Sequence, residues 1–266
     1  SISIYSSYVT VDGLQIAMTS NSGSGFSGIS DQGGSISNTY SNNIIKETNI
    51  TGSNRTGFQV TGAISGYNIR NNIIYGFSGT SHAGIIVYSV ATDFRINLNN
   101  NTIVNNTIGI DCLTDRCICN NNLSYNNTTS DYDSNSCVSA DSYNNLASDT
   151  SAQGNAAINS GTVNFIDAAN NDFRLASNDT TAKDAGLDLS SSIDSFQLDI
   201  VEHPRGSSWD IGAFEASTKI YRSLGWANTS SLESGTGNDL TISGSVATFA
   251  SAIASNIGVG DAIQYD

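Results

Sequence analysis

The chain is poor in proline, histidine and positive charge. Its 266 residues include one proline and two histidines, only 13% are charged, and 10 Lys and Arg stand against 24 Asp and Glu. A net charge of −14 would repel a phosphate backbone, which excludes nucleic acid as a partner. No apolar run approaches 18 residues, so we expect no membrane span. No signal-peptide pattern opens the sequence, and we expect any secretion signal to lie outside it.

What the chain has in abundance is Asn, Ser, Thr and Gly, while hydrophobic residues still make up 38%. A disordered chain of this length usually carries more charge and more proline. We therefore expect a folded protein in which the small polar residues form many tight turns around an aliphatic core.

Two markers recur along the chain in step. Pairs of asparagines followed by an apolar residue occur at Asn42-Asn43, Asn71-Asn72, Asn100-Asn101, Asn121-Asn122 and Asn144-Asn145. The second Asn advances by 29, 29, 21 and 23 residues, and a glycine before an apolar residue keeps step at Gly28, Gly57, Gly84 and Gly109. Markers that advance together indicate a repeat. We interpret the asparagines as structural, because Asn tolerates left-handed backbone angles and its amide can bond to the next repeat.

Between the markers, apolar and polar residues alternate with a period of two, for example over residues 8–11, 58–60 and 94–98. This period is typical of strands with one buried face. Short strands in a repeat of about 20–30 residues are typical of a parallel β-helix, whose coils stack about 4.8 Å apart. We predict an all-β chain with a right-handed parallel β-helix of about five or six turns over residues 1–164.

The steps NNIIYGF, NNTIVNN and NNLSYNN resemble the pectate-lyase-like superfamily of right-handed parallel β-helices. Residues 165–216 resemble the segment that closes the β-helix in many secreted bacterial repetitive surface proteins, since they contain DFRL, then DAG, then DIGAFE. The Ser-Pro that usually precedes DAG is replaced here by Thr181-Ala182-Lys183. The resemblance implies an extracellular location at the cell surface. It does not choose an activity, because the superfamily holds lyases, hydrolases, adhesins and fibre proteins.

Residues 217–266 lack the asparagine marker and alternate on either side of Ser243-Gly244-Ser245, which predicts a hairpin in a small β module. This module would begin a next repeat unit or link subunits. At the other end, Ser1-Ile2-Ser3-Ile4 is already strand-like, and an uncovered first turn exposes unpaired strand groups. Either the sequence is trimmed, or a neighbouring copy pairs with this end and builds a fibre by head-to-tail self-association.

Four cysteines lie close together, at Cys112, Cys117, Cys119 and Cys137. Their even number in a secreted-looking chain favours disulfides, and their spacing fits none of the usual zinc patterns. An offset of 20 residues, close to one turn, would stack Cys137 on Cys117 and leave Cys112 to pair with Cys119. Three connectivities are possible, and the sequence does not choose among them.

No recognisable catalytic set is present, which leans against an enzyme. Arg70, Arg95 and Arg116 recur about one turn apart and, with Asp93, would form a stripe for acidic sugar, although we favour solvated, partly paired surface charges as their explanation. The carboxylates that could serve a lyase are Asp93, Asp111, Asp115, Asp131 and Asp133, and the pair that could serve a glycosidase is Asp131 and Asp133. Both histidines, His82 and His203, are expected at the surface.

No cofactor is required by any motif. Acidic residues are dense in the closing segment, at Asp184, Asp188, Asp194, Asp199 and Asp210. They are weak candidates for structural Ca²⁺, and we favour instead that they accept backbone N–H groups in turns.

Two functions remain open. The first is an extracellular structural or adhesive module, one link of a repetitive surface or fibre-forming protein. The alternative is a polysaccharide-active enzyme, a lyase or glycosidase, or a carbohydrate-binding β-helix that uses its lateral face. The aromatic residues to inspect for the alternative are Tyr40, Tyr67, Tyr75 and Tyr88.

Overall fold

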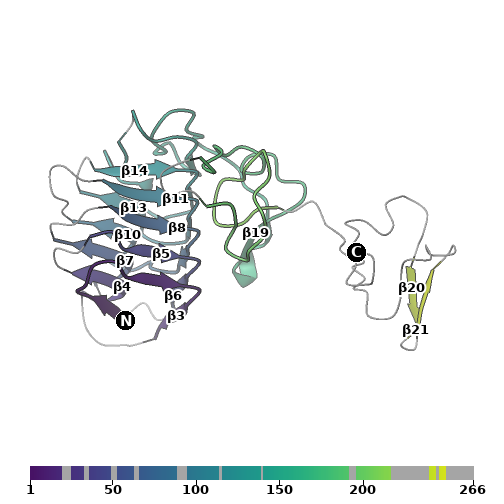
Figure 1. Cartoon of the computed structure of the whole chain (residues 1–266), viewed down its shortest axis with the longest axis horizontal. Coiled ribbons are helices and arrows are strands. Elements are labelled where there is room, and N and C mark those ends of the chain that lie inside the picture. The colour runs from purple at the N-terminus through teal and green to yellow at the C-terminus, as the bar shows by residue number, and fades with distance from the viewer. Residues whose placement is uncertain are drawn as a thin grey trace. The chain divides into compact units, whose positions relative to one another are not determined.

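A computed structural model of the chain describes residues 1–19, 25–32, 36–48, 53–62, 66–88, 95–113, 116–138, 140–191, 196–216, 240–243 and 246–249. The chain divides into two compact units, Ser1–Ala216 and Ser217–Asp266 (Figure 1). The candidate site described below lies in the first unit.

Three parallel sheets form the wall of the first unit. Sheet 1 holds β1 (Ile2–Ile4), β4 (Ser27–Gln32), β7 (Thr56–Thr61), β10 (Ala83–Val87), β13 (Ile108–Cys112) and β16 (Ser130–Tyr132). Sheet 2 holds β2 (Thr10–Asp12), β5 (Thr39–Ser41), β8 (Tyr67–Arg70), β11 (Ile96–Asn99) and β14 (Cys117–Asn120). Sheet 3 holds β3 (Gln15–Met18), β6 (Ile44–Glu47), β9 (Ile73–Tyr75), β12 (Thr102–Val104), β15 (Leu123–Tyr125) and β17 (Leu146–Ala147).

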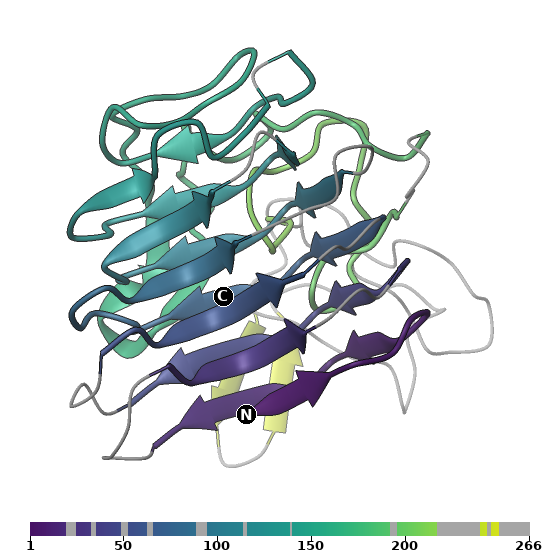
Figure 2. The ribbon, with the colours of Figure 1, turned by 90° about the vertical axis from the view of Figure 1, so that its left-hand side faces the viewer.

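Neighbouring strands within each sheet come from successive passes of the chain, so the strands stack as coils (Figures 1 and 2). The predicted class is confirmed: the unit is an all-β parallel β-solenoid. Inside the coils, equivalent side chains stack in register, as Ile45, Ile74 and Ile103 do, and all three are fully buried. The repeated glycine leaves room for this column, because a Cβ on Gly57 would lie 2.2 Å from Ile74 Cγ2.

The asparagine pairs form the bend between sheets 2 and 3, as expected. The first Asn of each pair has a left-handed backbone, with φ between +50° at Asn100 and +56° at Asn42. The second Asn is buried and bonds to the next turn: the backbone N–H and Nδ2 of Asn72 donate to Asn101 Oδ1 at 3.1 and 3.0 Å. Asn43, Asn101 and Asn122 repeat this double bond to the Asn above each of them. The interpretation of the marker as a structural ladder is confirmed.

A second, shorter ladder stands at the bend between sheets 3 and 1. The Phe77 N–H donates to Asn106 Oδ1 (3.1 Å), and Asn106 Nδ2 donates to Asn127 Oδ1 (3.0 Å). The ladder ends on the buried carboxylate of Asp131, which accepts from Asn127 Nδ2 (2.7 Å) and from the Ser148 N–H (2.6 Å). Every oxygen of this column therefore has a donor, which holds the bend rigid.

Residues 165–216, which we call the closing segment, include β18 (Phe165–Asp167), the 3₁₀ turn Ala168–Asn170 and β19 (Asp172–Leu175). The segment packs on the outer face of sheet 3, where Phe173 and Ala213 cluster with Ile73 and Val104. It lies along the side of the stack in both views (Figures 1 and 2).

The outward asparagines of the first bend fasten the closing segment. Asn71 Nδ2 donates to the Leu198 carbonyl (2.8 Å), and Asn121 Nδ2 donates to the Leu187 carbonyl (2.8 Å). Asn100 and Asn144 bond to this segment in the same way. The two asparagines of a pair thus have different roles. The second, buried Asn joins neighbouring turns, and the first Asn holds the closing segment against the coil.

The expected disulfides are present, but their predicted pairing is wrong. Cys112 pairs with Cys117 and Cys119 pairs with Cys137, with Cα–Cα distances of 6.5 and 5.6 Å. Cys137 does lie one turn above Cys117, because the Val138 N–H donates to the Cys117 carbonyl (2.8 Å). Cys117 is nevertheless engaged within its own turn, where Cys112 faces it across the short connection between β13 and β14. Spacing alone could not reveal that contact.

In the second unit, β20 (Leu240–Ser243) and β21 (Val246–Phe249) pair as an antiparallel hairpin at the position the sequence predicted. The sequence also predicts a turn and a strand over residues 256–265, which lie outside the described residues.

Candidate functional site

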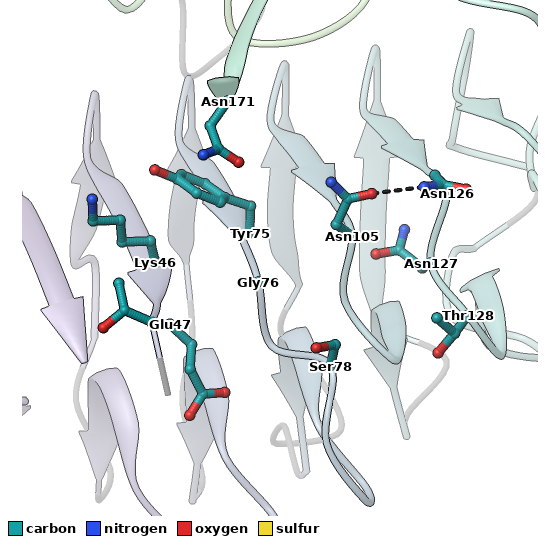
Figure 3. Close-up of a pocket in the computed structure, with 11 residues that line it drawn as sticks. Lys46, Glu47, Tyr75, Gly76, Ser78, Asn105, Asn126, Asn127, Thr128 and Asn171 are labelled. Atoms are coloured by element: carbon teal, nitrogen blue, oxygen red, sulfur yellow. Dashed lines mark hydrogen bonds between the residues drawn. The ribbon is translucent and has the colours of Figure 1, made fainter. Parts of the chain in front are cut away.

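A groove of about 640 Å³ opens on the outside of the bend between sheets 3 and 1 (Figure 3). Most of the residues that line it carry polar side chains: Lys46, Glu47, Thr48, Tyr75, Gly76, Ser78, Asn105, Asn126, Asn127, Thr128 and Asn171. Ten of these residues come from successive turns of the coil, and Asn171 comes from the closing segment, so the groove forms only where the two meet.

The stacked turns place the groove side chains in rows. Lys46 and Tyr75 are register partners on β6 and β9 and follow each other up the flank. One residue later the chain bends, with left-handed backbone at Gly76 (φ 85°), Asn105 (φ 58°) and Asn126 (φ 56°). Asn126 Nδ2 donates to Asn105 Oδ1 (2.7 Å), as Figure 3 shows. Each of these two amides keeps further donor or acceptor capacity for a ligand.

The closing segment supports the aromatic wall. The Tyr75 ring meets Phe173 edge to face, with ring centroids 5.2 Å apart. Asn171 ends the 3₁₀ turn with a left-handed backbone (φ 62°), and its N–H donates to the Ala168 carbonyl (3.2 Å). In Figure 3 its side-chain amide lies beside the Tyr75 ring. Tyr75 is therefore held by packing on one side while its other face remains on the groove.

The groove carries one positive charge that is not paired with a carboxylate. Lys46 is its only basic side chain, and among the described residues it makes no ion pair. Glu47 points the other way: its side chain is fully buried, with Oε1 2.8 Å from Arg55 Nε and Oε2 3.1 Å from His82 Nδ1. Burial raises the pKa of Glu47 and the neighbouring Arg55 and His82 oppose the rise.

The structure corrects the expectation that His82 lies at the surface. His82 is fully buried beneath the groove, and a Cβ on Gly79 would collide with its ring. Its partners Glu47 and Arg55 come from two other turns, so no local sequence pattern indicates that these three residues form a cluster. His203 is more than half exposed, in line with its expected place.

The predicted arginine stripe is not assembled. Arg95 and Arg116 immediately precede Ile96 and Cys117, which are register partners, so these two arginines do stack. Arg70 pairs instead with Asn99 at the opposite end of the strand, and its guanidinium lies over the Phe196 ring at 4.9 Å. Arg95 is also bound to Asp141 (3.2 Å). Asp93, the fourth member of the predicted stripe, lies outside the described residues.

Of the predicted carboxylates, the structure brings Asp111 and Asp133 together. They occupy neighbouring turns on sheet 1, because the Asp133 N–H donates to the Ile110 carbonyl (2.8 Å). Burial, and then repulsion from Asp133, raises the pKa of Asp111 to about 6. Asp131 instead ends the second ladder as a structural acceptor, and Asp115 lies outside the described residues.

Three of the predicted acidic residues of the closing segment, Asp188, Asp199 and Asp210, accept backbone N–H groups. Asp199 accepts the N–H groups of Val201 (2.9 Å) and His203 (2.8 Å), and Asp188 accepts the Ser190 N–H (2.8 Å). Asp210 accepts the Asp184 N–H (2.7 Å). In the part of the chain that the structure describes, no three His, Cys, Asp or Glu side chains converge as a metal site would require. Asp194 falls outside that part.

Of the four tyrosines singled out from the sequence, only Tyr75 lines the groove. Tyr40 and Tyr67 are completely buried in the core, whereas Tyr88 is 44% exposed elsewhere. Sequence reasoning missed Lys46, Asn105, Asn126 and Asn171. The sequence does contain a signal for Asn105 and Asn126. Asn105-Asn106 and Asn126-Asn127 are two further Asn-Asn dipeptides, and they lie 21 residues apart.

In comparisons with known proteins, no family model, no curated protein and no solved structure matches the chain. The described residues contain no helix with the length and apolar character needed to cross a membrane. Fold and site therefore define a β-solenoid with a polar lateral groove, whose amides, phenol ring and single ammonium group are suited to hold a ligand rich in hydroxyl groups.

Proposed function

We propose that the chain is an extracellular structural and adhesive module, a right-handed β-helix related to the pectate-lyase-like superfamily. It would act at the cell surface, as one link of a repetitive or fibre-forming protein. The observation that carries this proposal is the bracing of the coil: two disulfides, two amide ladders and a fastened closing segment make a stiff unit. Disulfides of this kind persist in oxidising compartments.

Self-association would use the first turn of the coil. β1, β2 and β3 are the edge strands of their sheets, and Tyr5 and Tyr8 beside them are 67% and 73% exposed. Edge strands pair readily with strands of another chain. A second copy that pairs there head to tail would extend the stack without closing it, which gives a fibre.

Sedimentation velocity and negative-stain microscopy over a range of concentrations test this assembly. We expect rods that lengthen with concentration. Ser3→Lys, which places charge on the exposed edge of β1, should shorten them, while Ser207→Lys in the closing segment should not. Monomers at every concentration would rule out head-to-tail assembly.

The second candidate, a carbohydrate binder, is favoured by the groove itself. Asn105, Asn126 and Asn171 offer amide donors and acceptors around the Tyr75 ring, a combination that suits sugar hydroxyls and the apolar face of a sugar ring. In an adhesive module this groove would be the contact with a polysaccharide.

A further inference from the structure

Residues 196–216, the last part of the closing segment, place three carboxylates around one guanidinium. Asp199, Asp210 and Arg205 are buried, and the Glu215 side chain is 9% exposed. Arg205 Nη1 donates to Glu215 Oε2 (3.1 Å), which also accepts the Asp210 N–H (3.0 Å). The Glu215 N–H in turn donates to Asp199 Oδ2 (2.9 Å). When all three carboxylates are ionised, three negative charges therefore face one positive charge.

The other charged groups of the closing segment do not remove this excess. Among the described residues, Arg205 is the only basic side chain within ion-pair distance of Glu215. His203 Nδ1 lies 3.9 Å from Asp199 Oδ2, and the His203 side chain is more than half exposed, so water screens its charge. Asp184 places a further carboxylate beside the cluster. Repulsion between buried carboxylates is weakened most directly by a proton on one of them.

The charge cluster coincides with the attachment of this segment to the coil. Arg205 Nη2 donates to Asn71 Oδ1 at the first bend (3.0 Å) and to the Gly212 carbonyl (3.1 Å). Arg70, a basic residue of the coil on this flank, lies over the Phe196 ring at 4.9 Å. The guanidinium that balances the carboxylates is therefore also a bridge to the coil. A change of charge in the cluster acts directly on the attachment.

The proton on Glu215 is held more tightly in the attached segment than in a detached one. Burial raises the pKa of Glu215 to about 7, and repulsion from Asp210 adds to the rise while Arg205 opposes it. A detached segment would return the pKa of this carboxyl to about 4.5. The attachment is therefore strongest below about pH 4.5 and weakens as the pH rises through about 7.

We propose that residues 196–216 form a proton-operated latch on the flank of the coil: a proton on Glu215 keeps the latch attached, and loss of that proton loosens it while the coil stays folded. The chain enters the second unit directly after Ala216, so an open latch lengthens the connection between the coil and that unit. This device goes beyond the structural and adhesive function proposed above and does not depend on it.

Hydrogen exchange on the full chain tests the latch, with the rates corrected for the intrinsic effect of pH. Protection of residues 196–216 should fall by up to about tenfold per pH unit between about pH 5 and 7, and level off above that range. Amides of β8 and β11 should stay better protected at every pH, because the coil remains folded when the latch opens. Protection of residues 196–216 that is independent of pH, or equal to that of β8 and β11, would overturn the proposal.

A pair of Glu→Gln variants identifies the group that operates the latch. Glu215→Gln keeps an acceptor oxygen for Arg205 but cannot ionise, so its latch should stay protected from about pH 5 to about pH 8. Glu202→Gln, at an exposed position of the same segment, should keep the pH dependence of the parent. A pH dependence that persists in Glu215→Gln would contradict the latch. An unprotected latch in Glu215→Gln at about pH 5 would contradict it too, because a neutral group at this position should hold the segment.

Discussion

At the scale of single residues, asparagine performs work that is usually divided among several residue types. At the first bend one Asn adopts the left-handed angle and the next one is buried as a hydrogen-bond bridge between turns. The buried amide has partners for both its donor and acceptor groups: Asn101 Nδ2 donates to the Ile69 carbonyl and to Asn122 Oδ1, while its Oδ1 accepts from Asn72. Its polarity is tolerable in the core only because these partners exist.

Asn101→Ala should therefore lower the free energy of unfolding by about 3 kcal/mol, because it removes the acceptor of the buried Asn72 N–H and the amide bonds to the Ile69 carbonyl and Asn122 Oδ1. Chemical denaturation followed by circular dichroism measures the loss. Asn97→Ala, on the partly exposed outer face of β11, is the matched control and should cost under about 1 kcal/mol. Similar losses in both variants would contradict the special role of the inner column.

Gly57→Ala should lower the free energy of unfolding about as much as Asn101→Ala. The new Cβ would lie 2.2 Å from Ile74 Cγ2 and 2.7 Å from the Gly84 carbonyl oxygen, so the coil must open. We expect a loss of about 2–3 kcal/mol and a lower melting temperature by calorimetry. Gly206→Ala, where a Cβ meets nothing within 4 Å, should melt like the parent. A parent-like melting temperature for Gly57→Ala would show that the glycine column is not a packing requirement.

At the scale of elements, the sequence predicted strands, bends and the recurrence of turns, because each depends on local periodicity. The sequence did not predict contacts that depend on the register between strands of neighbouring turns. The spacing of 25 residues predicts that Arg70 and Arg95 stack, yet the register partner of Arg70 is Asn99. The same limit misassigned Cys117 and hid the cluster of Glu47, Arg55 and His82. The groove needs a further contact with the closing segment, which no periodicity encodes.

The disulfide between Cys119 and Cys137 joins two turns near the last strands of the stack. The double variant Cys119→Ser, Cys137→Ser should lose about 3 kcal/mol of unfolding free energy, with the first disulfide intact. Hydrogen exchange should show the loss concentrated around β16 and β17. Mass spectrometry of the unreduced parent should recover the two bridges of the structure, and a bridge between Cys117 and Cys137 would contradict it.

The closing segment depends on one buried arginine. Arg205 donates to Asn71 Oδ1 (3.0 Å), to the Gly212 carbonyl (3.1 Å) and to Glu215 (3.1 Å), and it lies over the Trp209 ring at 5.2 Å. Arg205→Met should keep much of the volume but free residues 196–216 from the flank. We expect faster hydrogen exchange there, with exchange in β8 and β11 unchanged. Arg174→Met, exposed and paired only locally with Asp172, is the control.

At the scale of the whole molecule, stability should decrease as the pH rises from about 4.5 to 7. Burial raises the pKa of Glu215 to about 7 and that of Asp111 to about 6, so the folded chain holds protons that the unfolded chain has released. Their contribution is complete below the unfolded pKa and is lost as the pH passes the folded pKa. Melting temperatures across this range should fall by several degrees. Glu215→Gln with Asp111→Asn should flatten the slope, and an unchanged slope would contradict the assignment.

The fold and the groove both depend on coils stacked in register, with five asparagines in one buried column. A crystal structure of the chain tests this most directly. We predict that Asn43, Asn72, Asn101, Asn122 and Asn145 lie one above another, and that the Oδ1 of each of the last four lies about 3 Å from the backbone nitrogen of the preceding Asn. Asparagines scattered over unrelated positions, or antiparallel pairing of β6, β9 and β12, would contradict the fold and the groove built on it.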